Sequence, residues 1–167
     1  MSIKLGPCSL EYGSDTDAVT IDKTSGGVVL KVEPARTEVK IDQYGSTPYD
    51  HIITGWNVVA EVPVAETDYE MLKSVMVFLE EVTTDKKSLV NRKLGTSMRS
   101  LAKPLVLHPL ENGTDASEDI TLKLAAVENG IELGYNSEGI RVLQANFRAY
   151  PNGPATDKES YLSIGAP

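Results

Sequence analysis

Alternation between apolar and polar residues is the feature that most limits what this chain can fold into. Between Ile3 and Asn57, short runs rich in β-branched residues are separated by turn sequences such as Thr24–Gly27 and Gln43–Pro48. A side-chain period of two residues is typical of a strand with one buried face, and such turns favour hairpins. In the runs 28–33 and 37–42, the pattern points Val28, Leu30, Val32, Val39 and Ile41 inward and Lys31, Glu33, Glu38, Lys40 and Asp42 outward.

Further strands are expected along the rest of the chain. Tyr49–Val62 is the longest run of this kind, and Gly55 in its middle indicates a bulge or a bend. The dipeptides Asn112-Gly113 and Asn129-Gly130 suit turns with positive φ. The later runs are Pro104–Leu110, Ile120–Val127, Ile131–Tyr135 and Ile140–Tyr150, the last with Arg141, Leu143, Ala145, Phe147 and Ala149 on one face.

One segment changes period and predicts a helix. Its apolar positions recur at i, i+3, i+4 and i+7, as in the stripe of an amphipathic helix. Thr67 followed by Glu70 has the spacing of a capping box. We therefore expect a helix at about residues 68–81 that docks on the protein's own sheet, with a stripe facing a partner or a membrane as the alternative. The stripe consists of Leu72, Val75, Met76 and Leu79.

Two segments have little apolar periodicity. Thr83–Lys103 is rich in basic residues and is expected to be a long loop that is either mobile or ordered by a partner. Residues 151–167 are rich in Pro, Gly and Ser and are expected to form a flexible C-terminal tail that only a neighbour orders. The whole pattern predicts a single mainly β domain over residues 1–167: a β-sandwich or barrel of antiparallel strands, with one flanking helix and long connecting loops.

The charge balance argues against one large class of function. The chain has 167 residues, of which 24 are acidic and 16 are basic, and its formal net charge is −8. Proteins that grip nucleic acid need a basic face for the phosphates, so specific DNA binding is not expected. The apolar runs are far shorter than the ~20 residues of a membrane-spanning helix, and the N-terminus does not have the pattern of a signal peptide.

The sequence contains no motif that points to catalysis or to a bound metal. His51 and His108 lie far apart, neither has the spacing of a zinc site, and Cys8 is the single cysteine. Neither a Gly-x-Ser-x-Gly elbow nor a phosphate-binding Gly-x-x-x-x-Gly-Lys loop is present. Paired carboxylates could hydrolyse a glycoside, but 6% aromatic residues do not favour a sugar-stacking cleft. We therefore expect no enzyme, no cofactor and no metal.

A set of short motifs runs through residues 6–80. They are Gly6-Pro7-Cys8 with Leu10 and Tyr12-Gly13, then Thr24–Val28, Asp42–Asp50, Gly55 and Glu61-Val62-Pro63 before a capped helix. Together they resemble the tail tube (major tail) proteins of tailed bacteriophages. Beyond residue 80 the resemblance rests on the order of a loop and strands that end at Tyr150.

This resemblance implies a structural protein of the virion tail. In that family, a β-sandwich flanked by a helix assembles into rings, usually hexameric, that stack into a hollow tube through which DNA passes into the host. Assembly takes place in the host cytoplasm and involves no membrane. The implied partners are other copies of the chain, the tape measure protein, the baseplate or tail tip and the tail terminator. DNA passes without specific binding, and the family has no catalytic residues.

Two groups of residues are candidates for contacts in such a tube. The outward strand positions Lys31, Glu33, Glu38, Lys40 and Asp42 are candidate lumen-facing residues, with an ordinary solvated face as the alternative. The candidate subunit-interface residues are Thr24, Gly26, Gly27, Tyr44, Gly45, Pro48, Tyr49, Lys86, Lys87, Arg92, Lys93 and Arg99.

A monomeric β-sandwich that serves as a binding or adhesion module is the second hypothesis. Such a module would stay monomeric at high concentration and would present an aromatic-rich cleft. A tube protein would assemble and would have polar strands facing the lumen. The small number of aromatic residues favours the tube.

Overall fold

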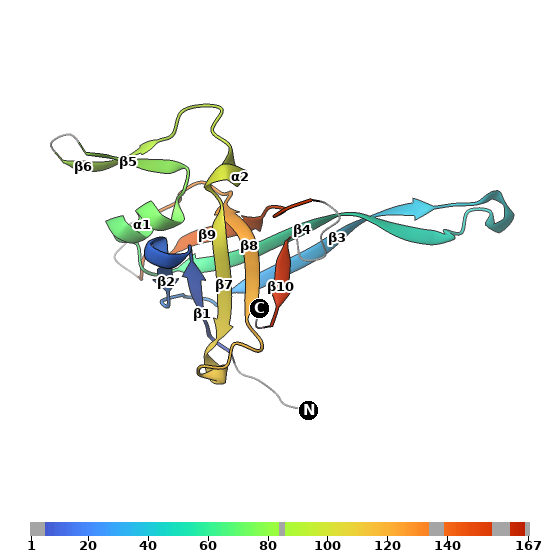
Figure 1. Ribbon diagram of the computed structural model, residues 1–167, viewed down its shortest axis with the longest axis horizontal. Helices are drawn as coiled ribbons and strands as arrows, with labels where there is room; N and C mark the ends of the chain where they lie inside the picture. The colour runs from blue at the N-terminus through green and yellow to red at the C-terminus, as the bar shows by residue number, and fades with distance from the viewer. Residues whose placement is uncertain (1–5, 84–85, 134–138, 155–160, 166–167) are drawn as a thin grey trace.

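The computed structural model describes residues 6–83, 86–133, 139–154 and 161–165. Its main element is an antiparallel sheet of eight strands in the order β2-β1-β7-β8-β9-β4-β3, with β10 paired to β8 (Figure 1). A second sheet is the hairpin of β5 and β6. The expected mainly β fold of antiparallel strands is confirmed. The strands are β1 (Cys8–Tyr12), β2 (Val19–Ile21), β3 (Val29–Val39), β4 (Asp50–Val64), β5 (Leu79–Thr83), β6 (Lys87–Asn91), β7 (Lys103–Pro109), β8 (Ile120–Val127), β9 (Leu143–Ala149) and β10 (Leu162–Ile164).

The core lies where the large sheet curls over on itself, as in a sandwich. In Figure 1, β3 and β4 cross behind the upright strands β1, β7 and β8. Tyr12 and Phe147 meet at its centre with ring centroids 4.9 Å apart, and the hydroxyl of Tyr12 donates to the carbonyl of Ala125. Burial raises the pKa of the Tyr12 phenol, which therefore stays neutral and keeps this hydrogen bond. The residues that the sequence places together on one face of β9 form its buried face, which consists of Leu143, Ala145, Phe147 and Ala149.

The helix after β4 is shorter than expected and begins one residue later. α1 spans Tyr69–Val75, and its N-cap is Asp68, whose carboxylate accepts from the backbone N–H of Met71 at 2.8 Å. The capping box on Thr67 was wrong, because Arg141 donates to the side chain and the carbonyl of Thr67. As predicted, the helix packs on the protein's own core, where Val75 is buried and Leu72 is partly buried.

The overestimate of the helix has a simple physical cause. Residues 75–79 are apolar without interruption, so they fit a helical period and an extended period equally well. In the structure, Leu79 already belongs to β5, which pairs with β6. The expected loop at 83–103 was also wrong. The described part of this segment contains β6 and a second short helix, α2 (Met98–Leu101). Met98 and Leu101 of α2 pack against the core.

Two other expectations also change. Leu162–Ile164 pair with Ile120–Leu122 of β8, so this part of the tail is ordered by its own chain. Residues 131–133 are not a strand, and 134 and 135 lie outside the described residues. At the expected turn Asn112-Gly113, Gly113 has positive φ. At the other, Asn129-Gly130, the side chain of Asn129 accepts a hydrogen bond from the N–H of Asn146 in β9 at 2.8 Å.

The N-cap makes a direct prediction about stability. Asp68→Ala removes the acceptor for the Met71 N–H and should lower the free energy of unfolding by about 1 kcal/mol. For a chain of this size, this is a fall in Tm of about 2–4 °C in thermal denaturation followed by circular dichroism. Asp68→Asn is the control, because it keeps an oxygen at the same place and should retain most of the stability. Equal losses in the two variants would contradict the capping role.

Candidate functional site

The most unusual feature of the molecule is a two-stranded arm, residues 32–57, that projects from the body (Figure 1). β3 and β4 are paired over 11 positions, from Val29↔Glu61 to Val39↔Asp50. β9 pairs with β4 only over Val59–Val64, so beyond that point each arm strand pairs only with the other. Both outer edges of the arm therefore keep backbone groups that no described strand satisfies.

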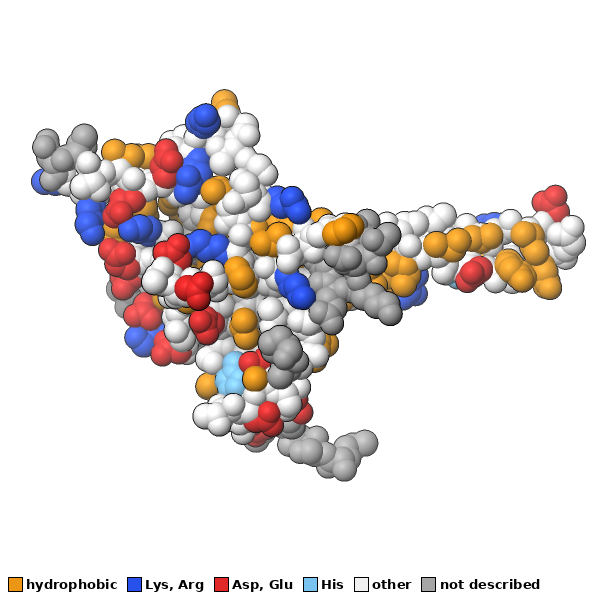
Figure 2. Space-filling view, in the orientation of Figure 1, with side chains coloured by type: hydrophobic (Ala, Val, Ile, Leu, Met, Phe, Trp, Pro, Cys, Tyr) orange, Lys and Arg blue, Asp and Glu red, His pale blue; other side chains and the backbone are white. Residues whose placement is uncertain are grey.

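Large apolar side chains are exposed along this arm. Trp56 is 44% exposed, Ile52 is 54% exposed and Tyr49 is 61% exposed. Figure 2 shows orange apolar atoms from the base of the arm to its tip. At the tip, the rings of Tyr44 and Tyr49 lie 5.5 Å apart. Scattered exposed apolar residues are normal, but a row of them on a projecting element is a mark of an interaction surface.

A β-bulge divides the arm, at the position that the sequence suggested for Gly55. Ala35 pairs with Gly55, whereas Arg36 pairs with Ile53, so Thr54 is the extra residue. Paired residues of an antiparallel ladder share one face. The bulge therefore places Ile53 on the same face as Trp56 and turns Ile52 to the other face.

These two faces continue from the body. We call the face that carries Leu30, Val58 and Ala60 the core-side face, because Val58 and Ala60 are buried in the core. Farther out, this same face carries Val32, Trp56 and Ile53, all of which are exposed. The opposite face carries Lys31 and Glu33 near the body and Ile52 farther out. The core-side face thus continues to carry large apolar side chains beyond the point where the core ends.

The five candidate lumen-facing residues do not share one face. Lys31 and Glu33 are on the opposite face, whereas Glu38 alternates onto the core-side face because β3 runs without interruption to Val39. Lys40 and Asp42 lie past the end of β3, and the Lys40 ammonium pairs with the Glu38 carboxylate at 3.2 Å. The positions that were expected to point inward are also divided between the two faces. Leu30 lies on the core-side face, whereas Val39 lies on the opposite face. Val32, expected inward, is exposed.

A polar network covers the opposite face near the body. The Lys31 ammonium pairs with the Glu61 carboxylate across the strands. The amide of Asn57 donates to Glu33 at 3.3 Å and accepts from Arg148 at 2.8 Å. Arg148 also forms an ion pair with Glu128, and this contact raises the pKa of the guanidinium. Both cations of this network are therefore neutralised by carboxylates of the same chain.

Some of the candidate interface residues lie in turns. Thr24 forms a bridge to Val64, and the neighbouring Ser25 N–H donates to the Pro63 carbonyl at 3.0 Å, so this segment is fastened to its own β4. Gly26 and Gly27 follow with φ of 108° and 83°, values that favour glycine. Tyr44, Gly45, Pro48 and Tyr49 come together at the tip of the arm, which also contains the short 3₁₀ helix Asp42–Tyr44.

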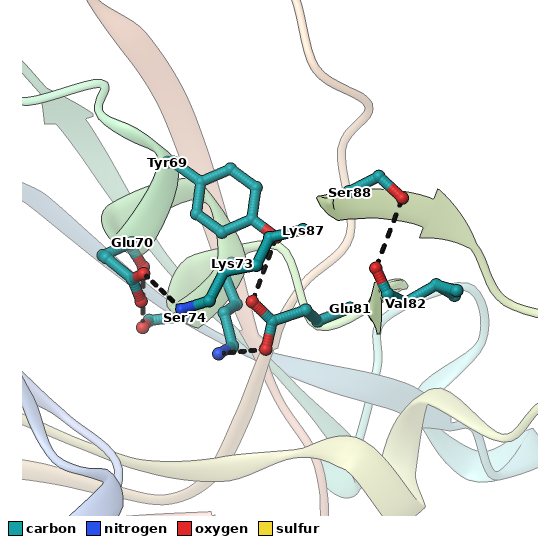
Figure 3. Close-up of polar contacts among 8 residues, drawn as sticks. All are labelled: Tyr69, Glu70, Lys73, Ser74, Glu81, Val82, Lys87 and Ser88. Carbon is teal, nitrogen blue, oxygen red and sulfur yellow. Dashed lines mark hydrogen bonds and ion pairs between the residues drawn. The ribbon is translucent and has the colours of Figure 1, made fainter. Parts of the chain in front are cut away.

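The basic candidates are largely engaged within the chain. Figure 3 shows α1 against the β5–β6 hairpin: Glu81 accepts from the Lys73 ammonium at 2.7 Å and from the Tyr69 hydroxyl at 3.1 Å. The hydrogen bond from Lys73 lowers the pKa of Glu81. On the same hairpin, Lys87 lies 4.0 Å from Glu70. This hairpin is thus pinned to the body by its charges.

Two arginines of this region act in the same way. The Arg92 guanidinium donates to the carbonyl of Val77 at 2.8 Å and contacts Glu80. The Arg99 guanidinium donates to the carbonyl of Pro151, which ties α2 to the chain after β9. Lys86 and Lys93 are exposed. The basic residues are thus spread over a folded hairpin, the connection that follows it and the helix α2, and do not form one flexible loop.

His108 forms a latch at the far end of the sheet. Its Nδ1 lies 2.6 Å from the Asp119 carboxylate and its Nε2 lies 2.9 Å from the Gly113 carbonyl. Both partners accept, so the geometry fits the doubly protonated imidazolium. The hydrogen bond to Asp119 is the main cause that raises the pKa of His108. The backbone carbonyl of Asp119 in turn accepts from the Gly165 N–H at 2.8 Å, which connects the latch to the turn after β10.

No group of three or more His, Cys, Asp or Glu residues capable of holding a metal ion is found in the described part of the chain. Among the helices described, none has the length and apolar character needed to cross a membrane. The sequence matches no model of a known protein family, and no curated protein is similar to it.

The latch predicts how stability depends on pH. Because folding raises the pKa of His108 above its ordinary value of 6.5, the latch contributes fully below that pH and is lost as the pH rises through the folded value. The difference in Tm between wild type and His108→Gln should therefore be largest at about pH 5.5–6, just below the pKa of a free imidazole, and should shrink toward about pH 9, a few units above that pKa. Asp119→Asn, which removes the anionic acceptor, should flatten the wild-type dependence. A constant difference across this range would contradict the latch.

Proposed function

We propose that this protein is a structural subunit that self-assembles into stacked rings and forms the hollow tail tube of a bacteriophage. The observation that carries the proposal is the arm, which exposes a row of apolar side chains and leaves both of its strand edges open. An element of this kind is costly on a solitary molecule, because it invites edge-to-edge association and exposes apolar surface to water. A partner that covers it in every copy removes both costs.

The topology of the large sheet supports closure into a ring. β2 and β3 are its two terminal strands, and each pairs with only one strand of the described chain. Different edges at the two ends of one sheet favour head-to-tail contacts, and such contacts close into a ring when the rotation between copies is right. Joining the sheets in a ring would bury the edges in one continuous barrel. Six copies is the number that the resemblance to tail tube proteins implies.

The opposite face near the body suits a wall past which DNA slides. A cation grips phosphate by displacing counterions, and each such contact adds affinity. Here Lys31 is paired with Glu61 and Arg148 with Glu128, so phosphate would have to compete with a carboxylate already in place. The net charge of −8 adds general repulsion. Lys31 and Glu33 fit this face, whereas Glu38 belongs to the other.

The remaining partners follow from the proposed role. A tube needs a protein that starts it, one that ends it and one that sets its length, which in the family are the baseplate or tail tip, the tail terminator and the tape measure protein. The product is part of the virion, and assembly takes place in the host cytoplasm. The chemistry of the subunit is then that of association, without a catalytic step.

Shortening the arm tests the proposal. In the variant, Thr37–Ile52 are replaced by Asn-Gly, a two-residue turn that can join the paired residues Arg36 and Ile53. The deleted segment contributes no buried residue, so Tm should stay within about 3 °C of wild type. In negative-stain electron microscopy and sedimentation, wild type should give rings or hollow tubes, whereas the variant should remain a monomer.

The matched control keeps the arm and changes its polar tip residues only, as Gln43→Asn with Ser46→Thr. This control should assemble like wild type. Normal tubes from the shortened variant would refute the arm as the assembly element. A wild-type chain that stays monomeric at every concentration, also when purified tail tips are added as initiators, would instead support a monomeric binding module.

A further inference from the structure

We propose that the arm is clamped between two other copies of the chain, with its core-side face against one and the outer part of its opposite face against the other. This inference rests on the proposed function, because it assigns the contacts within the same assembly. It differs from a simple docking arm, which would bury one face and leave the other in water.

The order of residues along the arm indicates that both of its faces are covered. A strand with one buried face alternates apolar and polar residues, whereas a strand that is buried on both faces contains consecutive apolar residues. Ile52 and Ile53 are adjacent and point to opposite faces, and each is more than half exposed in the single copy. Whichever face remained in water would therefore leave one isoleucine exposed.

Each face carries further apolar side chains. On the core-side face, Ile53 is accompanied by Val32 and Trp56. On the opposite face, Val39 lies at the last paired position, two residues along β3 from the partner of Ile52. The polar network around Lys31 and Glu33 ends nearer the body than these residues. The opposite face thus gains apolar side chains farther out, where Ile52 pairs with Thr37 and Val39 pairs with Asp50.

The size of the arm limits how much surface each of the two contacts can bury. Eight residues of β3 at about 3.3 Å each, in a ribbon two strands wide, present on the order of 300 Å² on each face. A stable interface buries about 800 Å² on each partner. Each face is therefore smaller than a stable interface by itself, so each of the two contacts must also include the open strand edges of the arm or surface of the body.

The occupants are copies of this chain because the body supplies receiving surfaces that its own arm cannot reach. Ile140 and Ile164 are about 70% exposed, and Leu94 is fully exposed. Figure 1 shows the outer part of the arm pointing away from the body, so a body surface that covers this outer part must come from another molecule. Contact between an arm and a different surface of the next copy is heterologous and can repeat along an assembly.

The experiment places a photo-crosslinking residue, p-benzoylphenylalanine, at position 52 or at position 53 of the full chain. Tubes are grown from a mixture of unlabelled crosslinker chains and ¹⁵N-labelled wild-type chains, so that products between copies are identified by mass. We expect both positions to crosslink to labelled chains, and we expect the two sets of crosslinked peptides to differ.

Aspartate substitutions provide an independent readout. Ile52→Asp and Ile53→Asp should each reduce the assembled fraction at least tenfold while Tm stays close to wild type. The matched control is Ile131→Asp, an exposed isoleucine of the body that should leave assembly unchanged.

The outcomes separate the two proposals. Crosslinks from only one of the positions, crosslinks from both to the same peptide, or normal assembly of either arm variant would overturn the clamp while the tube stands. If wild type does not assemble and neither crosslinker position gives products between copies, both proposals would be overturned. Distinct peptides from positions 52 and 53, with loss of assembly in both variants, would establish the clamp.

Discussion

The pairing of β3 with β4 is the interaction on which the rest of the structure depends. One continuous ladder serves two environments, because its inner part closes the core through Val58 and Ala60 and its outer part stands in water. The two strands stay paired on both sides of the bulge, so the arm can hold its shape without a core of its own. The bulge at Thr54 sets which side chain points to which face. The candidate site is therefore an extension of the fold, formed by the same strands.

Much of this architecture could be predicted from alternation in the sequence. The bounds of β8, the buried face of β9 and the bulge beside Gly55 all follow from period-two patterns and from the properties of glycine. Each of these signals is local, since a side chain's face in a strand depends only on its position. The helix was overestimated because the run through Leu79 is apolar at every position, so its period does not distinguish the two structures. The tail was misjudged because β10 is defined by a strand far away in sequence.

The arm itself was harder to predict. Trp56, Ile52 and Ile53 lie in the longest β-like run, and apolar residues in such a run are normally buried. Whether these residues are buried depends on how far the neighbouring strand β9 extends along β4, and this extent is set by the tertiary pairing of strands. A local signal did exist, namely the two adjacent isoleucines. Likewise, the basic residues near Arg92 suggested a free loop, whereas their carboxylate and carbonyl partners fasten a hairpin to the body.

The way in which β4 enters the body also has a mechanical meaning. β4 is joined to β9 by six register pairs, Val59↔Arg148 to Val64↔Leu143, and the hydrogen bonds of such a ladder lie across the strand direction. Tension along the arm would therefore load these bonds side by side, in shear, and would have to break them together. A sideways force would open the ladder one pair at a time. The arm is thus built to resist stretching along its axis far better than peeling.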